Sequence, residues 1–133
     1  MKKIIMLSLL LTFSCQQPVK KEQPQEPTFG IVIHGGAGTI LRANMTPETE
    51  SAYRKVLAEA IKVGHAILKN GGSSQEAVEK TIHVMEDSPL FNAGKGAVLT
   101  ADETIELDAS FMHGAQLDAG AISGVRTIKH PIS

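Results

Sequence analysis

The chain has 133 residues, of which 42% are hydrophobic and 20% are charged, and its formal net charge is −1 at pH 7. These values are typical of one globular domain and exclude a disordered or a fibrous chain. Because acidic and basic residues are intermixed, and only one Tyr and four Phe are present, the sequence predicts no nucleic-acid partner. Small, uncharged substrates are the better expectation.

Residues 1–15 have the layout of a secretory signal peptide. Two lysines precede an apolar run from Ile4 to Phe13, which is too short to span a bilayer. Cys15 is the only cysteine and follows a small residue, as in the cleavage box of a bacterial lipoprotein. We therefore expect a lipidated Cys15 that anchors an exported protein to a membrane or leaves it in the periplasm. The alternative is a plain signal peptide with an incidental cysteine.

Residues 16–28 form a polar, proline-rich segment with almost no side chain to bury. Such a composition predicts an extended, disordered tether without packed structure. Order is therefore expected to begin at Phe29, and residues 29–133 are expected to form the folded part.

Phe29–Ile33 is a short β-branched run that predicts a buried strand, and the glycine-rich turn His34–Gly38 ends it. A glycine-rich turn after a strand can cradle a phosphate, but that motif requires an immediate helix and a following Lys-Ser/Thr pair or third spaced glycine. Neither follows here. The turn is therefore predicted to let the backbone approach a neighbouring group closely.

Two helices are predicted next. Thr46 is placed as an N-cap before Pro47, and this helix should run to Asn70. Ser73 begins a capping box, and the second helix should end near Asp87, because Ser88-Pro89 prevents its continuation.

From Ala97 onward the pattern predicts strands, with Ile105, Leu107, Ala109 and Phe111 alternating on one face. Residues 97–100 and 104–111 are expected to pair around a turn at 101–103, and a third strand, residues 119–125, should follow a turn at Gly114. Helices followed by hairpin strands do not alternate as in a parallel fold. The predicted class is therefore α+β, with a helix layer on a mainly antiparallel sheet.

Few residues are suited to chemistry. His34 could act as a general base, but no Ser or Cys nucleophile lies in a recognisable setting beside it, so a hydrogen-bonded structural role is favoured. His65 and His83 should lie on solvated helix surfaces. Glu106 and Asp108 share one face of a strand and could form an acid–base pair or bind a metal, although strand alternation alone explains both.

Asn92 lies between a helix and a strand in the expected order of elements. Its side-chain amide could donate to a developing oxyanion or orient a nucleophile. Turn formation is an equally good local explanation of this asparagine.

Several motifs, in order and at similar separations, resemble the amino-terminal part of the plant-type asparaginase/isoaspartyl peptidase family. They are His34-Gly35-Gly36-Ala37-Gly38, Gly71-Gly72-Ser73, Pro89-Leu90-Phe91-Asn92-Ala93-Gly94, Glu106-Leu107-Asp108-Ala109, Gly120-Ala121 and Ile128-Lys129-His130-Pro131. The first and third motifs favour the isoaspartyl peptidase branch over the related glycosylasparaginases.

The resemblance implies an N-terminal nucleophile hydrolase with an αββα sandwich, of which residues 29–133 form a part. In such enzymes a precursor cleaves itself before a threonine, whose freed α-amino group then activates its own hydroxyl. The implied reactions are ammonia release from L-asparagine and hydrolysis of β-aspartyl dipeptides. The nucleophile is expected beyond Ser133, so no catalytic residue is assigned within the chain. The implied partners are the β-subunit and a second αβ unit.

The resemblance also implies supporting roles. Asn92 corresponds to an asparagine close to the nucleophile, and His34, Gly35 and Gly36 correspond to a loop that influences self-processing. No organic cofactor is expected, but a structural sodium ion held by backbone carbonyls is. The matching positions are Met85, Glu86, Ser88, Phe91, Ala93 and Lys95.

Two interpretations remain. In the first, the chain is an incomplete part of an exported asparaginase/isoaspartyl peptidase and is inactive alone. The ending at His130-Pro131, where proline is typical of the first turn of a helix, favours this interpretation. In the second, the chain is a catalytically silent, lipid-anchored binding domain or the product of a pseudogene.

Overall fold

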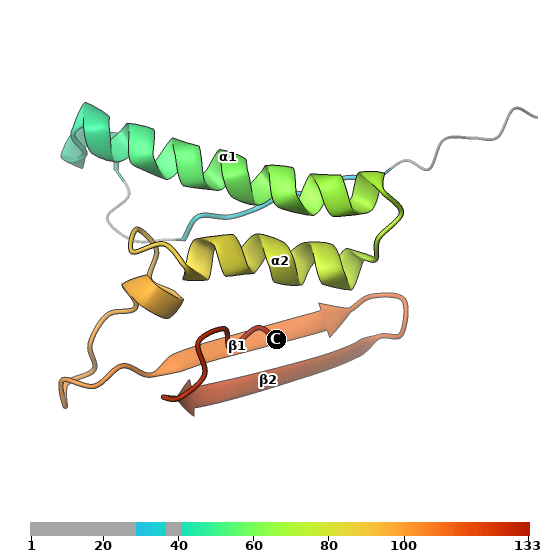
Figure 1. Ribbon diagram of the computed structural model, residues 1–133. Coiled ribbons are helices and arrows are strands. Elements are labelled where there is room, and N and C mark those ends of the chain that lie inside the picture. The colour runs from blue at the N-terminus through green and yellow to red at the C-terminus, as the bar shows by residue number, and fades with distance from the viewer. Residues whose placement is uncertain (1–28, 37–40) are drawn as a thin grey trace, which may run out of the picture.

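The computed structural model describes residues 29–36 and 41–133 (Figure 1). The predicted signal peptide with Cys15, the predicted tether and the last two residues of the glycine turn lie outside the described residues. The elements follow one another as η1 (Arg42–Asn44), α1 (Pro47–Lys69), α2 (Ser74–Glu86), η2 (Gly94–Gly96), β1 (Leu107–His113) and β2 (Asp118–Val125), where η marks a short 3-10 helix.

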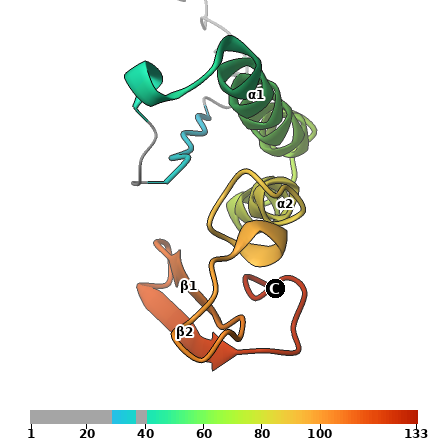
Figure 2. The same ribbon diagram turned by 90° about the vertical axis from the view of Figure 1, so that its left-hand side faces the viewer.

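The two α-helices and the hairpin form separate layers. Figures 1 and 2 show α2 lying between α1 and the antiparallel β1–β2 hairpin. Along β1, Leu107, Ala109 and Phe111 are half-buried and alternate with exposed residues, whereas β2 is exposed almost throughout. This arrangement is a partial α+β unit, as expected of an incomplete αββα sandwich. Within the two described ranges, no helix is long and apolar enough to cross a lipid bilayer.

The predicted start of α1 is confirmed. Thr46 is the N-cap, its hydroxyl accepts a 3.2 Å hydrogen bond from the Thr49 amide, and Pro47 is the first helical residue. The helix ends at Lys69, and Gly71 follows with φ 81°, a left-handed conformation that glycine adopts without strain. Local sequence signals therefore set both ends of this helix.

The capping residue of α2 is Ser73, whose hydroxyl accepts a 3.1 Å hydrogen bond from the Glu76 amide. We expect Ser73→Ala to lower the free energy of unfolding by about 1 kcal/mol, because the helix loses a partner for one of its free amides. Urea unfolding measures this loss. Ser74→Ala, one residue later and inside the helix, is the control and should change stability little; an equal loss in both variants would contradict a capping role.

Small residues form the contact between the two helices. Ala60 and Gly64 of α1 are buried, as are Ala77 and Thr81 of α2. The Thr81 hydroxyl donates a 2.6 Å hydrogen bond to the Ala77 carbonyl, so its polar atom is satisfied within the helix. The helices can therefore approach closely where Gly64 offers no side chain.

The prediction of a strand at Phe29–Ile33 is wrong for the described structure, because this segment belongs to no hydrogen-bonded ladder among the described residues. Ile31 and Ile33 are half-buried while Val32 is 94% exposed. The Phe29 ring lies 5.1 Å from the His65 ring of α1. The alternating pattern thus serves packing on the helices, and packing alone does not supply the partner strand that a ladder requires.

The predicted hairpin between residues 97–100 and 104–111 is also wrong in its pairing. The structure pairs β1 with β2, and the segment before β1 forms a loop. The Thr100 amide donates to the Thr104 carbonyl over 2.8 Å, and the two threonine hydroxyls lie 2.9 Å apart. These bonds close the predicted turn without continuing into strands. The third predicted strand, residues 119–125, is confirmed as part of β2.

Candidate functional site

The predicted site residues gather around the segment that follows α2, residues 87–97, which we call the connecting loop. The Tyr53 hydroxyl of α1 donates a 2.6 Å hydrogen bond to the Leu90 carbonyl. The Tyr53 ring also meets the buried Phe91 ring edge-on, with centroids 5.5 Å apart. These two contacts fix the middle of the connecting loop against α1.

Asn92 follows this anchored phenylalanine. Its side-chain oxygen accepts a 2.9 Å hydrogen bond from the Val98 amide. The bond closes the connecting loop, so Asn92 has a structural role there. It also engages the oxygen of the carboxamide, so the NH₂ group of the exposed side chain is left to donate elsewhere.

Two glycines let the connecting loop fold tightly onto its own backbone. Gly94 has φ 50°, and a Cβ there would lie 2.5 Å from the Glu86 carbonyl oxygen. A Cβ at Gly96 would overlap the Phe91 carbonyl oxygen and lie 2.8 Å from the Pro89 carbonyl group. Carbonyl oxygens therefore crowd the inside of the loop, where any larger residue would displace them.

The six positions matched to a sodium site lie on this loop and the last turn of α2. Their carbonyls are hard oxygen donors, which suit a hard cation. Some of these carbonyls also accept backbone bonds: Phe91 from the Ala93 amide at 2.8 Å and Ala93 from the Gly96 amide at 3.1 Å. A carbonyl oxygen has two lone pairs, so such a bond leaves one for an ion. The chemistry of these donors fits the sodium ion that the resemblance implies.

The described part of the glycine turn lies beside the connecting loop. A Cβ on Gly35 would lie 3.6 Å from the Phe91 ring and 3.4 Å from Leu57. The Gly36 amide donates a 3.2 Å hydrogen bond to Nδ1 of the exposed His34, which confirms the hydrogen-bonded role expected for this histidine. The structure thus brings two of the predicted site segments together at Phe91.

Glu106, which directly precedes β1, and Asp108, within β1, both bond across the hairpin. Asp108 Oδ1 accepts 2.8 Å hydrogen bonds from the Gly124 amide and the Ser123 hydroxyl, where the pairing of β1 and β2 is irregular. The Gly124 bond, and then the Ser123 bond, lower the pKa of the Asp108 carboxyl. Glu106 pairs with the Arg126 guanidinium. Each carboxylate therefore has a structural partner across the hairpin.

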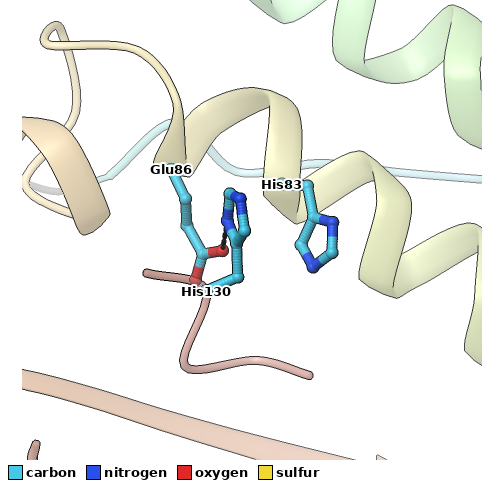
Figure 3. A group of neighbouring side chains, drawn as sticks. All are labelled: His83, Glu86 and His130. Atoms are coloured by element: carbon cyan, nitrogen blue, oxygen red, sulfur yellow. Dashed lines mark hydrogen bonds and ion pairs between the residues drawn. The ribbon is translucent and has the colours of Figure 1, made fainter. Parts of the chain in front are cut away.

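A second cluster, which sequence reasoning missed, joins α2 to the segment after β2. His83 was expected to be solvated, but its side chain is only 20% exposed because His130 stacks on it, with ring centroids 4.2 Å apart and planes at 25°. Figure 3 shows His130 lying between His83 and Glu86. His130 Nδ1 lies 2.9 Å from Glu86 Oε2. The prediction for His65 is confirmed, since that residue is exposed.

Burial is the main cause that lowers the pKa of the His83 imidazole, and the neighbouring His130 adds to this. One signal in the sequence pointed to the cluster: His83 and Glu86 are three residues apart, and so share a face of a helix. Nothing local in the sequence shows that His130 joins them.

Comparisons with known proteins agree with the family resemblance of the sequence motifs. The family model described as asparaginase matches residues 26–133. The chain is 47% identical over 102 residues to the isoaspartyl peptidase of Salmonella typhimurium, and these cover 77% of this chain and 33% of that protein. It is 48% identical over 103 residues to the plant-type L-asparaginase of Pyrococcus furiosus, covering 77% and 32%.

The chain therefore spans about a third of the length of the curated relatives it matches. The family match extends over most of the chain and includes the glycine turn, the connecting loop and both strands of the hairpin. On this evidence the chain belongs to the asparaginase family that includes the isoaspartyl peptidases and the plant-type L-asparaginases.

Proposed function

We propose that the chain is the amino-terminal part of a hydrolase that releases ammonia from L-asparagine and splits β-aspartyl dipeptides. The observation that carries the proposal is the packing of Gly35 beside Phe91, which brings the glycine turn to the loop that holds Asn92. The names of the relatives, isoaspartyl peptidase and plant-type L-asparaginase, support these two reactions. The nucleophilic threonine belongs to a segment beyond residue 133.

Asn92 is proposed to act toward that nucleophile through its NH₂ group. The oxygen of its carboxamide is held by the Val98 amide, so the side chain has a fixed orientation before substrate arrives. A fixed donor near a reacting oxygen stabilises developing negative charge without reorganisation. The loop around Asn92 is proposed to hold a sodium ion through the six backbone carbonyls, which stiffens the same support.

The remaining proposals concern the complete protein. A β-subunit would cover the exposed hairpin, where Met112 is 68% exposed and Leu117 is 88% exposed, and two αβ units would pair. Cys15 is proposed to carry a lipid that anchors the exported enzyme. Mass spectrometry of the mature amino terminus tests the lipid directly.

In the full-length protein we expect Asn92→Asp to lower kcat for both substrates by roughly a hundredfold, because aspartate keeps the oxygen acceptor for Val98 but lacks the NH₂ donor. Ammonia release and dipeptide hydrolysis measure the effect, and thermal unfolding should change little. Asn44→Asp, at the exposed end of η1, is the matched control. An unchanged kcat in Asn92→Asp would show that the amide serves the turn alone.

The 133-residue chain is expected to show no turnover of either substrate when purified alone. Ammonia release that persists through further purification would contradict the placement of the nucleophile. Absence of turnover in the full-length protein would instead favour the silent binding domain.

A further inference from the structure

We propose that His83, Glu86 and His130 form a binding site for a first-row transition-metal dication, with Zn²⁺ the best fit. The three side chains each offer one ligand atom, and these atoms all lie within 4.8 Å of one another. The site is inferred from these three ligands alone and does not depend on the proposed hydrolase activity. A bound metal ion would link the segment after β2 to α2.

The fold brings the ligands together from two directions. His83 and Glu86 stand one turn apart on the same face of α2, since residues three apart are neighbours on a helix. His130 arrives from the segment after β2, next to the buried Pro131 (Figure 3). Two of the ligands lie on one helix, and the third comes from a segment distant in the sequence. A metal bound by such a set links two parts of a fold.

Two of the ligand atoms are close enough together to bind one ion. His130 Nδ1 and Glu86 Oε2 are 2.9 Å apart. Neighbouring ligands of a dication with bonds near 2.1 Å are separated by about 3.0 Å in octahedral geometry and somewhat more in tetrahedral geometry. The metal would replace the proton that these two atoms share. His83 completes the set by turning out of its stack with His130, because stacked rings do not point their lone pairs at one centre.

The chemistry of the donors selects the metal. Two imidazoles and one carboxylate favour Zn²⁺ and its transition-metal neighbours over Na⁺, Mg²⁺ or Ca²⁺, which prefer oxygen ligands only. Glu86 is only 4% exposed, and a buried carboxylate requires a positive partner.

Further polar groups surround the ligands. In the stacked arrangement that the structure shows, His83 Nε2 lies 2.8 Å from the Ser133 hydroxyl, which donates a 3.1 Å hydrogen bond to Glu79. His130 Nε2 lies 3.7 Å from the carboxylate of Asp87. Metal-binding imidazoles usually have such carboxylates or hydroxyls beside them, which orient the ring and raise its basicity.

The test is titration of the full-length protein, free of any histidine tag, with ZnCl₂ by calorimetry and with CoCl₂ by absorption in the visible range. We expect one equivalent of metal that is lost, or bound at least tenfold more weakly, in both His130→Ala and His83→Ala. His65→Ala, at an exposed position of α1, is the matched control and should bind as the wild type does. Zn²⁺ should also raise the Tm of the wild type and not that of His130→Ala.

Unchanged Zn²⁺ affinity in either ligand variant would overturn the proposal, as would an equal loss in His65→Ala. If His130→Ala fails to fold without metal, His130→Gln and His83→Ala decide the question by the same titration. Retained binding in those two variants would show that the cluster is only a hydrogen-bonded contact.

Discussion

Gly96→Ala is expected to destabilise the protein by about 3 kcal/mol, in the upper range for overpacking in a tight interior. The new Cβ would overlap the Phe91 carbonyl oxygen and lie 2.8 Å from both atoms of the Pro89 carbonyl group. All of these are backbone atoms, so no side-chain rotation relieves the clash. The connecting loop must open instead, which carries Asn92 away from the Val98 amide.

Urea unfolding and the kcat of the full-length protein measure the two consequences of Gly96→Ala, and both should fall together. Gly114→Ala is the control, because a Cβ at Gly114, in the turn between β1 and β2, meets nothing within 4 Å. It should leave stability and kcat close to the wild type. A Gly96→Ala protein with wild-type stability would mean that the loop is not packed on its own backbone as described.

Local signals in the sequence predicted the helices well. Thr46 and Ser73 cap helices through bonds to amides three residues ahead, so a few neighbouring residues decide where each helix begins. Whether a segment forms a strand depends on its pairing with another segment elsewhere in the chain. Residues 97–100 have the apolar and β-branched composition of a strand, yet the loop closes through Thr100 and Thr104 before any ladder forms.

The candidate site was predictable only where a motif carried it. The motif around Asn92 marked the connecting loop, but its contact with Gly35 joins residues far apart in the sequence. His83 looked like a surface residue because its helix position alone says nothing about His130, which covers it from the segment after β2. Pairings of this kind depend on the tertiary fold, which the local pattern does not encode.

Gly64→Ala is expected to destabilise the protein by about 2 kcal/mol, although alanine is the better helix former by about 1 kcal/mol. A Cβ at Gly64 would overlap the Thr81 hydroxyl oxygen of α2 and the Ile31 Cδ1 atom, and would lie 3.2 Å from the Ala77 carbonyl oxygen. Either these two side chains must leave their positions, which would break the Thr81–Ala77 hydrogen bond, or the two helices must separate where their buried residues meet. The clash therefore outweighs the gain in helix propensity.

Removing the two clashing side-chain atoms tests whether the clash is the cause. Thr81→Ala removes the hydroxyl, and Ile31→Val removes the Cδ1 atom. In this double background Gly64→Ala should become neutral or stabilising, because propensity then dominates and only the 3.2 Å approach to the Ala77 carbonyl remains. Urea unfolding of Ala58→Gly, at an exposed position of α1, measures how much the free energy of unfolding changes through helix propensity alone. If Gly64→Ala cost the same free energy in both backgrounds, the destabilisation would not arise from the helix contact, and the close approach of α1 and α2 would have to be set by other residues.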